Sequence, residues 1–192
     1  HRRMIIDTPF VYFHKNTLND NIIDRIKQYA DSVEQEQGIL FKTDKNDDVR
    51  KSSLKWIHHN QNSQWIYDTV KSIVDPVNDG LFQFDLTGID TIQYTQYIKS
   101  GDKYDFHADS APGVQYPTNM VRKLTMVIQM SDENDYEGGS VEFMSGKQYN
   151  DVAPRKKGSI VIFPSFVMHK VTPILSGKRN SLVTWFMGPK FR

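Results

Sequence analysis

The chain has 192 residues, of which 38% are hydrophobic and 24% charged, a composition typical of one globular domain with a substantial core. Its 24 basic and 23 acidic residues leave a formal net charge of +1, and the two signs are interspersed. Charge therefore gives no support for a nucleic-acid-binding or membrane-surface protein. The absence of cysteine excludes disulfides, thiolate metal ligands and a cysteine nucleophile.

The sequence contains no apolar run long enough to span a membrane, and it does not begin with a signal-peptide pattern. We therefore expect a cytoplasmic protein. We also expect residues 1–192 to form a single domain, with residues 4–80 as a helical support region and residues 81–192 as a β-rich core. The sequence does not indicate the oligomeric state.

The N-terminal part of the chain predicts an extended strand followed by a helix. Met4–Phe13 is rich in strand-forming residues and is interrupted by Pro9. Thr17 can cap the helix, and Asp20, three residues later, completes a pair similar to a capping box. The apolar residues at helical spacing are Leu18, Ile22, Ile26, Tyr29 and Val33.

A loop and a second helix are expected next. The segment from Lys42 to Ser53 is polar, charged and without periodicity, which predicts a mobile loop. A second helix should begin near Ser63 and end at Pro76 and Gly80, because proline and glycine interrupt helices. Its apolar face consists of Trp65, Ile66, Thr69, Val70, Ile73 and Val74.

After Gly80 the hydrophobic pattern changes to that of short β-strands separated by Gly, Pro, Asn and Asp. The expected strands are Leu81–Leu86, Asp90–Ile98, Tyr104–His107, Lys123–Ser131, Ser140–Phe143, Ser159–Phe163, Lys170–Pro173 and Ser181–Met187. Short strands after two helices predict a mainly β fold with flanking α-helices (α+β). A closed or double-sheet β-barrel would then be supported by helices on one side.

His107 and Asp109 form the first pair with a chemical pattern. They lie two residues apart, so in an extended strand both side chains leave the same face. An imidazole and a carboxylate suit a divalent first-row metal. A second histidine from another strand would complete the two-histidine, one-carboxylate triad of non-heme Fe(II) oxygenases. His169 is the candidate for that third ligand.

A series of motifs extends over nearly the whole chain. These motifs are Tyr97-x-x-x-Gly101-x-x-Tyr104-x-x-His107-x-Asp109, Arg122-Lys123-Leu124-Thr125, Tyr136-Glu137-Gly138-Gly139, Gly158-Ser159 leading to Phe163-Pro164-Ser165, His169-x-Val171-x-Pro173, and Gly177-x-Arg179-x-Ser181-Leu182. In order and spacing they resemble the 2-oxoglutarate- and Fe(II)-dependent dioxygenases of the prolyl 4-hydroxylase type, in particular small bacterial and phage hydroxylases. The resemblance implies a double-stranded β-helix, or jelly-roll, core, and a bacterial or phage-infected cell as the source.

The resemblance assigns His107, Asp109 and His169 as Fe(II) ligands. Such a set leaves three coordination positions for other ligands. Three histidines outside the motifs are expected on the surface or in packing, namely His14, His58 and His59.

A dicarboxylate cosubstrate needs a cation at its far end, and a guanidinium fits because it bonds a carboxylate with two parallel hydrogen bonds. Arg179 and Ser181 lie two residues apart on one expected strand, so the serine hydroxyl can donate to the same carboxylate. This Arg-x-Ser pattern resembles the family's 2-oxoglutarate anchor, and we count Arg179 with the catalytic residues. Animal collagen-type enzymes have a lysine where this chain has Arg179.

Further pocket residues are implied by the resemblance. Tyr97 matches a tyrosine that reaches the cosubstrate by a hydrogen bond, and Thr125 and Gln129 lie on a strand expected to line the same pocket. Tyr104 and Trp185 are candidates for the substrate side of the site. Trp185 resembles an aromatic residue that lies near the substrate in the family.

The resemblance implies O2-dependent hydroxylation of a C–H bond, with a peptidyl proline as the first choice, release of succinate and CO2, and ascorbate as a further cofactor. The loops Lys42–Ser53 and Ser110–Met120 should flank the substrate entrance. We expect a peptide or protein substrate, and neither nucleic acid nor a membrane as a partner. The alternatives are nucleic-acid N-demethylation or free amino-acid hydroxylation by the same chemistry, and a non-catalytic jelly-roll binding module.

Overall fold

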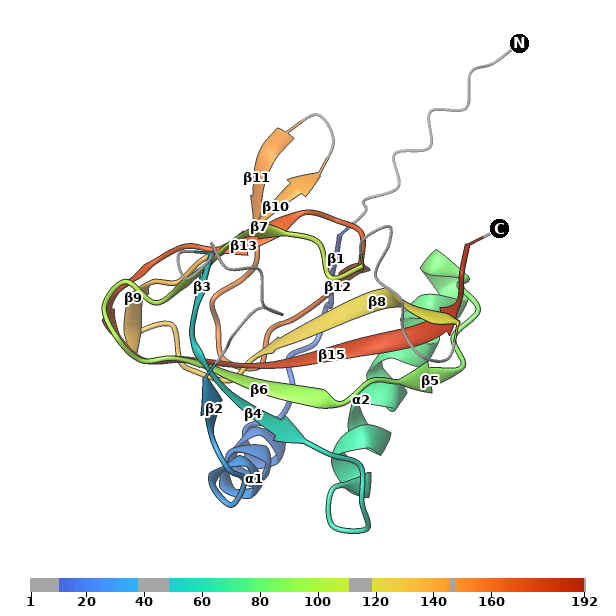
Figure 1. Cartoon of the computed structure of the whole chain (residues 1–192), viewed down its shortest axis with the longest axis horizontal. Coiled ribbons are helices and arrows are strands. Elements are labelled where there is room, and N and C mark those ends of the chain that lie inside the picture. Colours follow the sequence, from blue (N-terminus) through green and yellow to red (C-terminus); the bar gives the residue numbers. More distant parts are fainter. Residues whose placement is uncertain (1–10, 38–48, 111–118, 146–147, 192) are drawn as a thin grey trace.

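The computed structural model describes residues 11–37, 49–110, 119–145 and 148–191, and in these residues the chain is a mainly β protein with two α-helices (Figure 1). Among them, no helix combines the length and the apolar character that crossing a membrane requires. The predicted N-terminal strand Met4–Phe13 lies mostly outside the described residues. Its last two residues form β1 (Tyr12–Phe13).

Within the described ranges, most strands belong to two antiparallel sheets. The larger sheet has the order β1, β12 (Ile160–Pro164), β8 (Met120–Gln129), β15 (Arg179–Pro189), β6 (Ile92–Tyr97), β4 (Ser53–Ile57) and β2 (Glu36–Gln37), with β5 (Gly88–Ile89) beside β15. The smaller sheet has the order β11 (Gln148–Val152), β10 (Val141–Ser145), β13 (His169–Val171), β7 (Lys103–His107) and β3 (Arg50–Lys51). The remaining pair is β14 (Ile174–Gly177) with β9 (Tyr136–Gly138). The predicted mainly β fold with flanking helices is confirmed.

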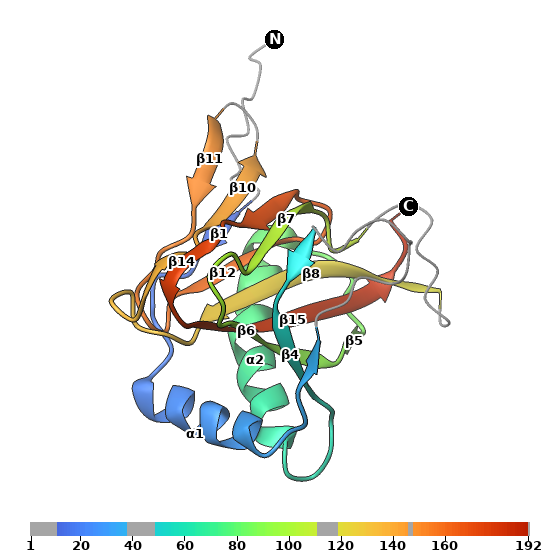
Figure 2. The same cartoon turned by 60° about the vertical axis from the view of Figure 1, so that its left-hand side comes forward.

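The two main sheets face each other, and β7 lies above β8 and β15 in both cartoon views (Figures 1 and 2). One buried apolar cluster contains residues of both sheets: Tyr97 and Phe163 come from the larger sheet, and Phe143 and Val171 from the smaller one. Two sheets packed across a shared apolar layer are the arrangement expected for a jelly roll.

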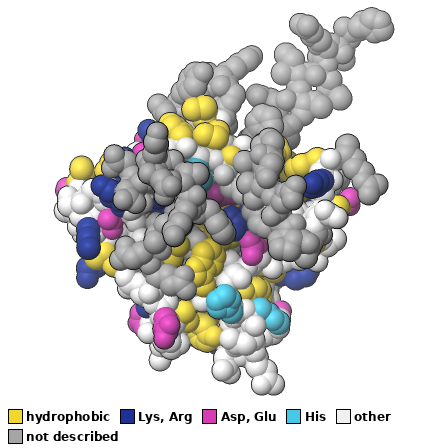
Figure 3. All heavy atoms as spheres, viewed as in Figure 1, with side chains coloured by type: hydrophobic (Ala, Val, Ile, Leu, Met, Phe, Trp, Pro, Cys, Tyr) yellow, Lys and Arg dark blue, Asp and Glu magenta, His cyan; other side chains and the backbone are white. Residues whose placement is uncertain are grey.

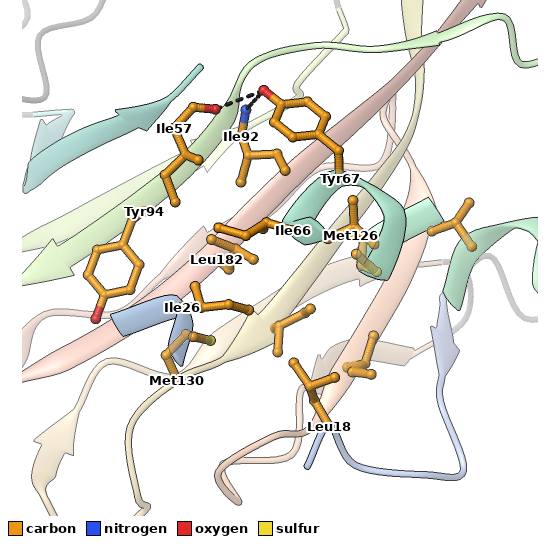
Figure 4. Packing of buried hydrophobic residues seen from close by; sticks show 14 of the residues in the cluster. Leu18, Ile26, Ile57, Ile66, Tyr67, Ile92, Tyr94, Met126, Met130 and Leu182 are labelled. Carbon is orange, nitrogen blue, oxygen red and sulfur yellow. Dashed lines mark hydrogen bonds between the residues drawn. The ribbon is translucent and has the colours of Figure 1, made fainter. Parts of the chain in front are cut away.

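The helices α1 (Asp20–Asp31) and α2 (Gln64–Val77) cover the other face of the larger sheet (Figure 2). Tyr67 fixes α2 to this sheet, because its hydroxyl donates to the carbonyl of Ile57 at 2.7 Å and accepts from the N–H of Ile92 at 3.4 Å (Figure 4). The fully buried residues labelled in Figure 4 are Ile26, Ile57, Ile66, Ile92, Met126, Met130 and Leu182.

The strands β8 and β15 separate this apolar core from a polar face. Met126 and Leu182 point to the helices and belong to the main apolar cluster. The alternate residues Thr125, Gln129 and Ser181 are buried on the opposite face, between the sheets, and Ser181 lies directly opposite Gln129 in the strand register. Because side chains alternate between the two faces of a strand, a row of polar side chains lies between the two sheets.

The predicted cap of the first helix is wrong. Asn19, not Thr17, is the N-cap residue, and its side chain accepts the N–H of Asn21 at 2.8 Å. The backbone before it is extended, since the N–H of Leu18 donates to the carbonyl of Gly158 at 2.8 Å. This contact with the segment preceding β12 delays the start of α1 to Asp20.

The predicted strand Leu81–Leu86 is also wrong. Pro76 lies inside α2, and the helix continues through a π-helical turn, η1 (Asn78–Phe82), that includes Gly80. The side-chain amide of Asn78 donates to the carbonyl of Phe84 at 2.9 Å, and its oxygen accepts the N–H of Phe84 at 3.0 Å. These bonds fold the segment onto the end of the helix and satisfy backbone groups that a strand would have paired.

The predicted loop Lys42–Ser53 is only partly described, because residues 42–48 lie outside the described ranges. Its end is not a loop, since Arg50–Lys51 form β3 and Ser53 begins β4. The strand β4 was not predicted; in it the polar Lys55 is buried, and its ammonium donates to the carbonyl of Ala30 at 2.9 Å. The strands of the first 80 residues therefore contribute to both sheets.

The other predicted strands are present with small shifts at their ends, and they correspond to β6, β7, β8, β10, β12, β13 and β15. The short strands β2, β5, β9, β11 and β14 were not predicted. Of the predicted loop Ser110–Met120, residues 111–118 lie outside the described part of the chain.

Candidate metal centre

His107, Asp109 and His169 come together between β7 and β13. His107 and His169 lie directly opposite each other in the register of these two strands, and Asp109 follows β7 by two residues. The Nε2 atom of His107 lies 3.4 Å from Oδ1 of Asp109, and that of His169 lies 3.5 Å from Oδ2. In the described residues this is the one group of three such side chains whose ligand atoms all lie within 4.8 Å of one another. Two imidazoles and a carboxylate at this spacing could hold a divalent metal ion.

Backbone carbonyls fix the orientation of both imidazoles. Nδ1 of His107 donates to the carbonyl of Asp105 at 2.7 Å, and Nδ1 of His169 donates to the carbonyl of Val167 at 2.9 Å. Because the proton is then on Nδ1, the lone pair of Nε2 points to the centre of the triad, next to Asp109.

Asp109 is held in place by the larger sheet. The hydroxyl of Thr125 on β8 donates to Oδ2 of Asp109 at 2.8 Å and lies 2.9 Å from the hydroxyl oxygen of Ser165. The N–H of Asp109 donates to the carbonyl of Ser165 at 2.8 Å. The orientation of Asp109 is thus fixed by a hydrogen bond to its carboxylate and by another from its backbone N–H.

The protonation states suit metal binding. Burial raises the pKa of Asp109, but the neighbouring His169 and His107 and the hydroxyl of Thr125 lower it by more, so the pKa lies well below its usual range. Burial lowers the pKa of His169, and the nearby Asp109 opposes this only in part. An ionised carboxylate next to a neutral imidazole is the state in which both groups can bind a metal.

Arg179 lies at the end of the same polar face. Its side chain is 2% exposed, and within the described part of the chain its Nε and Nη1 atoms have no hydrogen-bond partner. Tyr97 lies opposite Arg179 in the register of β6 and β15, and the guanidinium carbon is 5.4 Å from the centroid of its ring. A buried guanidinium with free donors fits a carboxylate ligand, because such a charge is otherwise costly to bury.

A pocket opens beside Arg179. Its walls include polar Gln129 and Tyr136 and apolar Val127 and Val161. The amide of Gln129 donates to the hydroxyl of Tyr136 at 2.6 Å, so both side chains are fixed at the pocket wall. The pocket thus presents polar and apolar side chains next to the guanidinium.

The remaining predicted cosubstrate residues lie at two ends of the site, some near Arg179 and one at the triad. Ser181 is buried two residues from Arg179 on the same strand face, as expected. Burial raises the pKa of the Tyr97 phenol, which keeps it neutral and able to donate a hydrogen bond. Thr125 is not at the Arg179 end, since its hydroxyl bonds Asp109 at the triad.

The two predicted substrate-side residues flank the triad. The ring of Tyr104 stacks on that of His107, with centroids 3.4 Å apart. Trp185 lies opposite Thr125 in the strand register, and its buried Nε1 has no partner in the described residues. The guanidinium carbon of Arg122 lies 3.7 Å from the centroid of the Trp185 ring.

Several residues that contact the site had no predicted role. Ser165 and Arg122 stand in the quoted motifs, and their position there was the signal that could have identified them. Arg50, whose guanidinium carbon lies 4.6 Å from the ring centroid of Tyr104, stands in a segment that was predicted as a loop. No sequence pattern marks it.

Comparison with known proteins agrees with this geometry. Residues 92–187 match the family model of the 2OG-Fe(II) oxygenase superfamily. A PKHD-type hydroxylase of Synechococcus sp. is 35% identical over 86 residues, which are 45% of this chain but only 37% of that relative. The structure of a prolyl-4-hydroxylase from Pseudomonas putida superposes with a TM-score of 0.72 at 18% identity, over 96% of this chain and 95% of that one. A second structure is that of a prolyl hydroxylase from Trichoplax adhaerens, in complex with a peptide fragment of the hypoxia inducible factor oxygen degradation domain. It superposes with a TM-score of 0.73 at 18% identity, over 94% of this chain and 84% of that one. The fold is therefore that of these structures, and the chain belongs to the 2OG-Fe(II) oxygenase superfamily.

Proposed function

We propose that the chain is a hydroxylase in which His107, Asp109 and His169 bind Fe(II) and Arg179 binds the distal carboxylate of 2-oxoglutarate. Membership of the superfamily implies these two cofactors. The observation that carries the proposal is the pairing of the triad with a buried Arg179 on the facing sheet, whose Nε and Nη1 atoms have no hydrogen-bond partner in the described residues. The match to PKHD-type hydroxylases covers less than half of their length, so their activity comes to this chain as a proposal.

When bound, Fe(II) and 2-oxoglutarate supply the difficult chemistry: O2 is consumed, 2-oxoglutarate becomes succinate and CO2, and one oxygen atom enters a C–H bond of the substrate. The chain supplies position and charge. Arg179 and the hydroxyl of Ser181 hold the far carboxylate, and the neutral phenol of Tyr97 donates to it from the neighbouring strand. Gln129 stays at the pocket wall through its bond to Tyr136.

At the other end of the site, Thr125 keeps the Asp109 carboxylate turned toward the two imidazoles. Val127 and Val161 form an apolar part of the pocket wall beside Arg179, and apolar side chains of this kind would keep bulk water from a ligand bound there. Orientation at both ends fixes the cosubstrate relative to the metal before O2 reacts.

For the substrate we propose a peptide or protein side chain, with proline as the first choice and ascorbate as a further cofactor. The related Trichoplax prolyl hydroxylase is seen with a peptide fragment bound. On the face shown in Figure 3, basic and acidic side chains of the described residues are interspersed, and no continuous basic track of the kind that nucleic-acid phosphates need is visible. We also propose that residues 1–192 act as one domain, with residues 81–192 as the β-helix core.

The test is turnover of 2-oxoglutarate with Fe(II) and O2 in the presence of three substrates: a proline-rich peptide, free proline and a methylated single-stranded oligonucleotide. We expect succinate to increase with the peptide and the peptide to gain the mass of one oxygen atom. Stimulation by the oligonucleotide with release of formaldehyde would favour demethylation. Binding of 2-oxoglutarate without any succinate, with or without substrate, would favour a non-catalytic binding module.

A further inference from the structure

The two histidines of the triad are held in different ways. The ring of His169 lies among buried aromatic side chains, with its centroid 4.7 Å from that of Phe163 and 6.1 Å from that of Phe143. The ring of His107 stacks almost parallel on Tyr104, at an interplanar angle of 12°. The orientation of His107 therefore depends on how Tyr104 is held as well as on the bond from Nδ1 to the carbonyl of Asp105.

Arg50 holds Tyr104 from the edge of the smaller sheet. It lies opposite Tyr104 in the register of β3 and β7, with its guanidinium carbon 4.6 Å from the ring centroid. Because the imidazole of His107 occupies one face of the ring at 3.4 Å, the guanidinium has room only over the other face. A cation over a tyrosine ring is attracted by the ring electrons, so the three side chains form a stack that ends at the triad.

Two hydrogen bonds fix the guanidinium itself. Nε of Arg50 donates to the hydroxyl of Ser52 at 2.9 Å, and Nη2 donates to Oε1 of Gln93 at 2.8 Å. Gln93 is 3% exposed on β6 of the larger sheet, and its Oε1 also accepts from the hydroxyl of Thr95 at 2.9 Å. Arg50 thus joins the sheet that carries His107 to a buried polar network of the other sheet.

We propose that Arg50 is a positioning residue, which presses Tyr104 against His107 and so fixes the imidazole for metal binding. This inference rests on the proposed function, because it takes His107 as a metal ligand. Removing a group that orients a ligating histidine typically weakens metal binding about 10–100-fold. Since Arg50 acts through an intervening ring, we expect a loss at the lower end of that range.

The test is Mn(II) binding to the metal-free chain, followed by loss of the paramagnetic resonance signal of the free ion. Arg50→Met removes the charge and both hydrogen bonds but keeps a long unbranched side chain, and it should raise the Kd about tenfold. Arg25→Met is the matched control, because the guanidinium carbon of Arg25 lies 4.3 Å from the ring centroid of Trp65, between α1 and α2. It should leave the Kd unchanged.

A double-substitution cycle with Tyr104→Leu separates positioning from a general loss of structure. If Arg50 acts through Tyr104, then Arg50→Met should weaken Mn(II) binding no further once the ring is gone. Ser52→Ala, which removes one of the two bonds that fix the guanidinium, should raise the Kd about threefold and carries the test if Arg50→Met does not fold.

Two results would overturn the inference. The first is an unchanged Kd for Mn(II) in Arg50→Met or, where that variant does not fold, in Ser52→Ala. The second is that Arg50→Met weakens Mn(II) binding equally with and without the Tyr104 ring. Failure of the unaltered chain to bind Mn(II), or full affinity in His107→Ala, would instead contradict the metal site of the proposed function.

Discussion

Arg179 connects the stability of the folded chain to its proposed cosubstrate. The side chain is almost fully buried, yet two of its nitrogen atoms have no partner in the described residues. A buried charge without partners destabilises a fold, whereas a bound carboxylate both neutralises it and accepts its hydrogen bonds. Arg179 is thus placed to favour binding of a dicarboxylate.

Replacing Arg179 with methionine should therefore weaken 2-oxoglutarate binding at least about tenfold, because a shielded charge-assisted pair is typically worth about 2–5 kcal/mol. Calorimetric titration of the Mn(II)-loaded protein without O2 measures this directly. Lys178→Met is the control, since Lys178 is the exposed residue directly before β15. If Lys178→Met lost affinity and Arg179→Met did not, the anchor would be Lys178.

The hydroxyl of Thr125 has a comparable role at the metal end. Thr125→Val keeps the shape of the side chain but removes the donor to Asp109, and we expect Mn(II) affinity to fall about tenfold or more. Thr184→Val is the matched control one strand away, because the buried hydroxyl of Thr184 has no hydrogen-bond partner in the described residues. It should leave metal affinity unchanged and not reduce stability. Equal metal affinity in both variants would exclude a positioning role for Thr125.

At the level of elements, β8 and β15 carry the polar residues that face the site on one side and core residues on the other. This could be predicted from sequence, because period-two alternation is local: Leu124, Met126 and Ile128 alternate with Thr125 and Gln129. The strand Leu81–Leu86 could not be excluded from sequence, since its residues favour β structure. The side-chain bonds of Asn78 to Phe84 override that preference.

Two leucine substitutions test whether the core face determines stability without affecting the metal site. Leu182→Ala should lower the free energy of unfolding by about 2–5 kcal/mol, because Leu182 is 0% exposed beneath the helices. Leu175→Ala on β14 should change it little, because that side chain is 66% exposed. Urea unfolding measures both. At low denaturant, Leu182→Ala should bind Mn(II) normally, and a large loss of affinity would mean that core and site are not separable.

At the scale of the whole molecule, the fold assembles a site from segments far apart in the chain. His107 and Asp109 were predictable from ligand type and close spacing, and His169 from its place in the order of motifs that resemble the family. The stack that begins at Arg50 was not, because it depends on the pairing of a two-residue edge strand with β7. Residue types that carry chemistry are thus easier to predict than the long-range contacts that hold them.

The two ends of the proposed cosubstrate site lie on different sheets, the triad on the smaller one and Arg179 on the larger one. A ligand that binds both ends ties the sheets together, so Mn(II) and 2-oxoglutarate together should raise the melting temperature by more than the sum of their separate effects. At about 100 times its Kd, a ligand that binds only the folded state adds about 2.7 kcal/mol of stability. Calorimetric melting of the chain with neither, either and both ligands provides the comparison.

Two variants serve as controls. Arg179→Met should keep the increase in melting temperature from Mn(II) and lose the one from 2-oxoglutarate, and Asp109→Asn should lose both. If 2-oxoglutarate raised the melting temperature equally with and without Mn(II), the cosubstrate would not bridge the triad and Arg179.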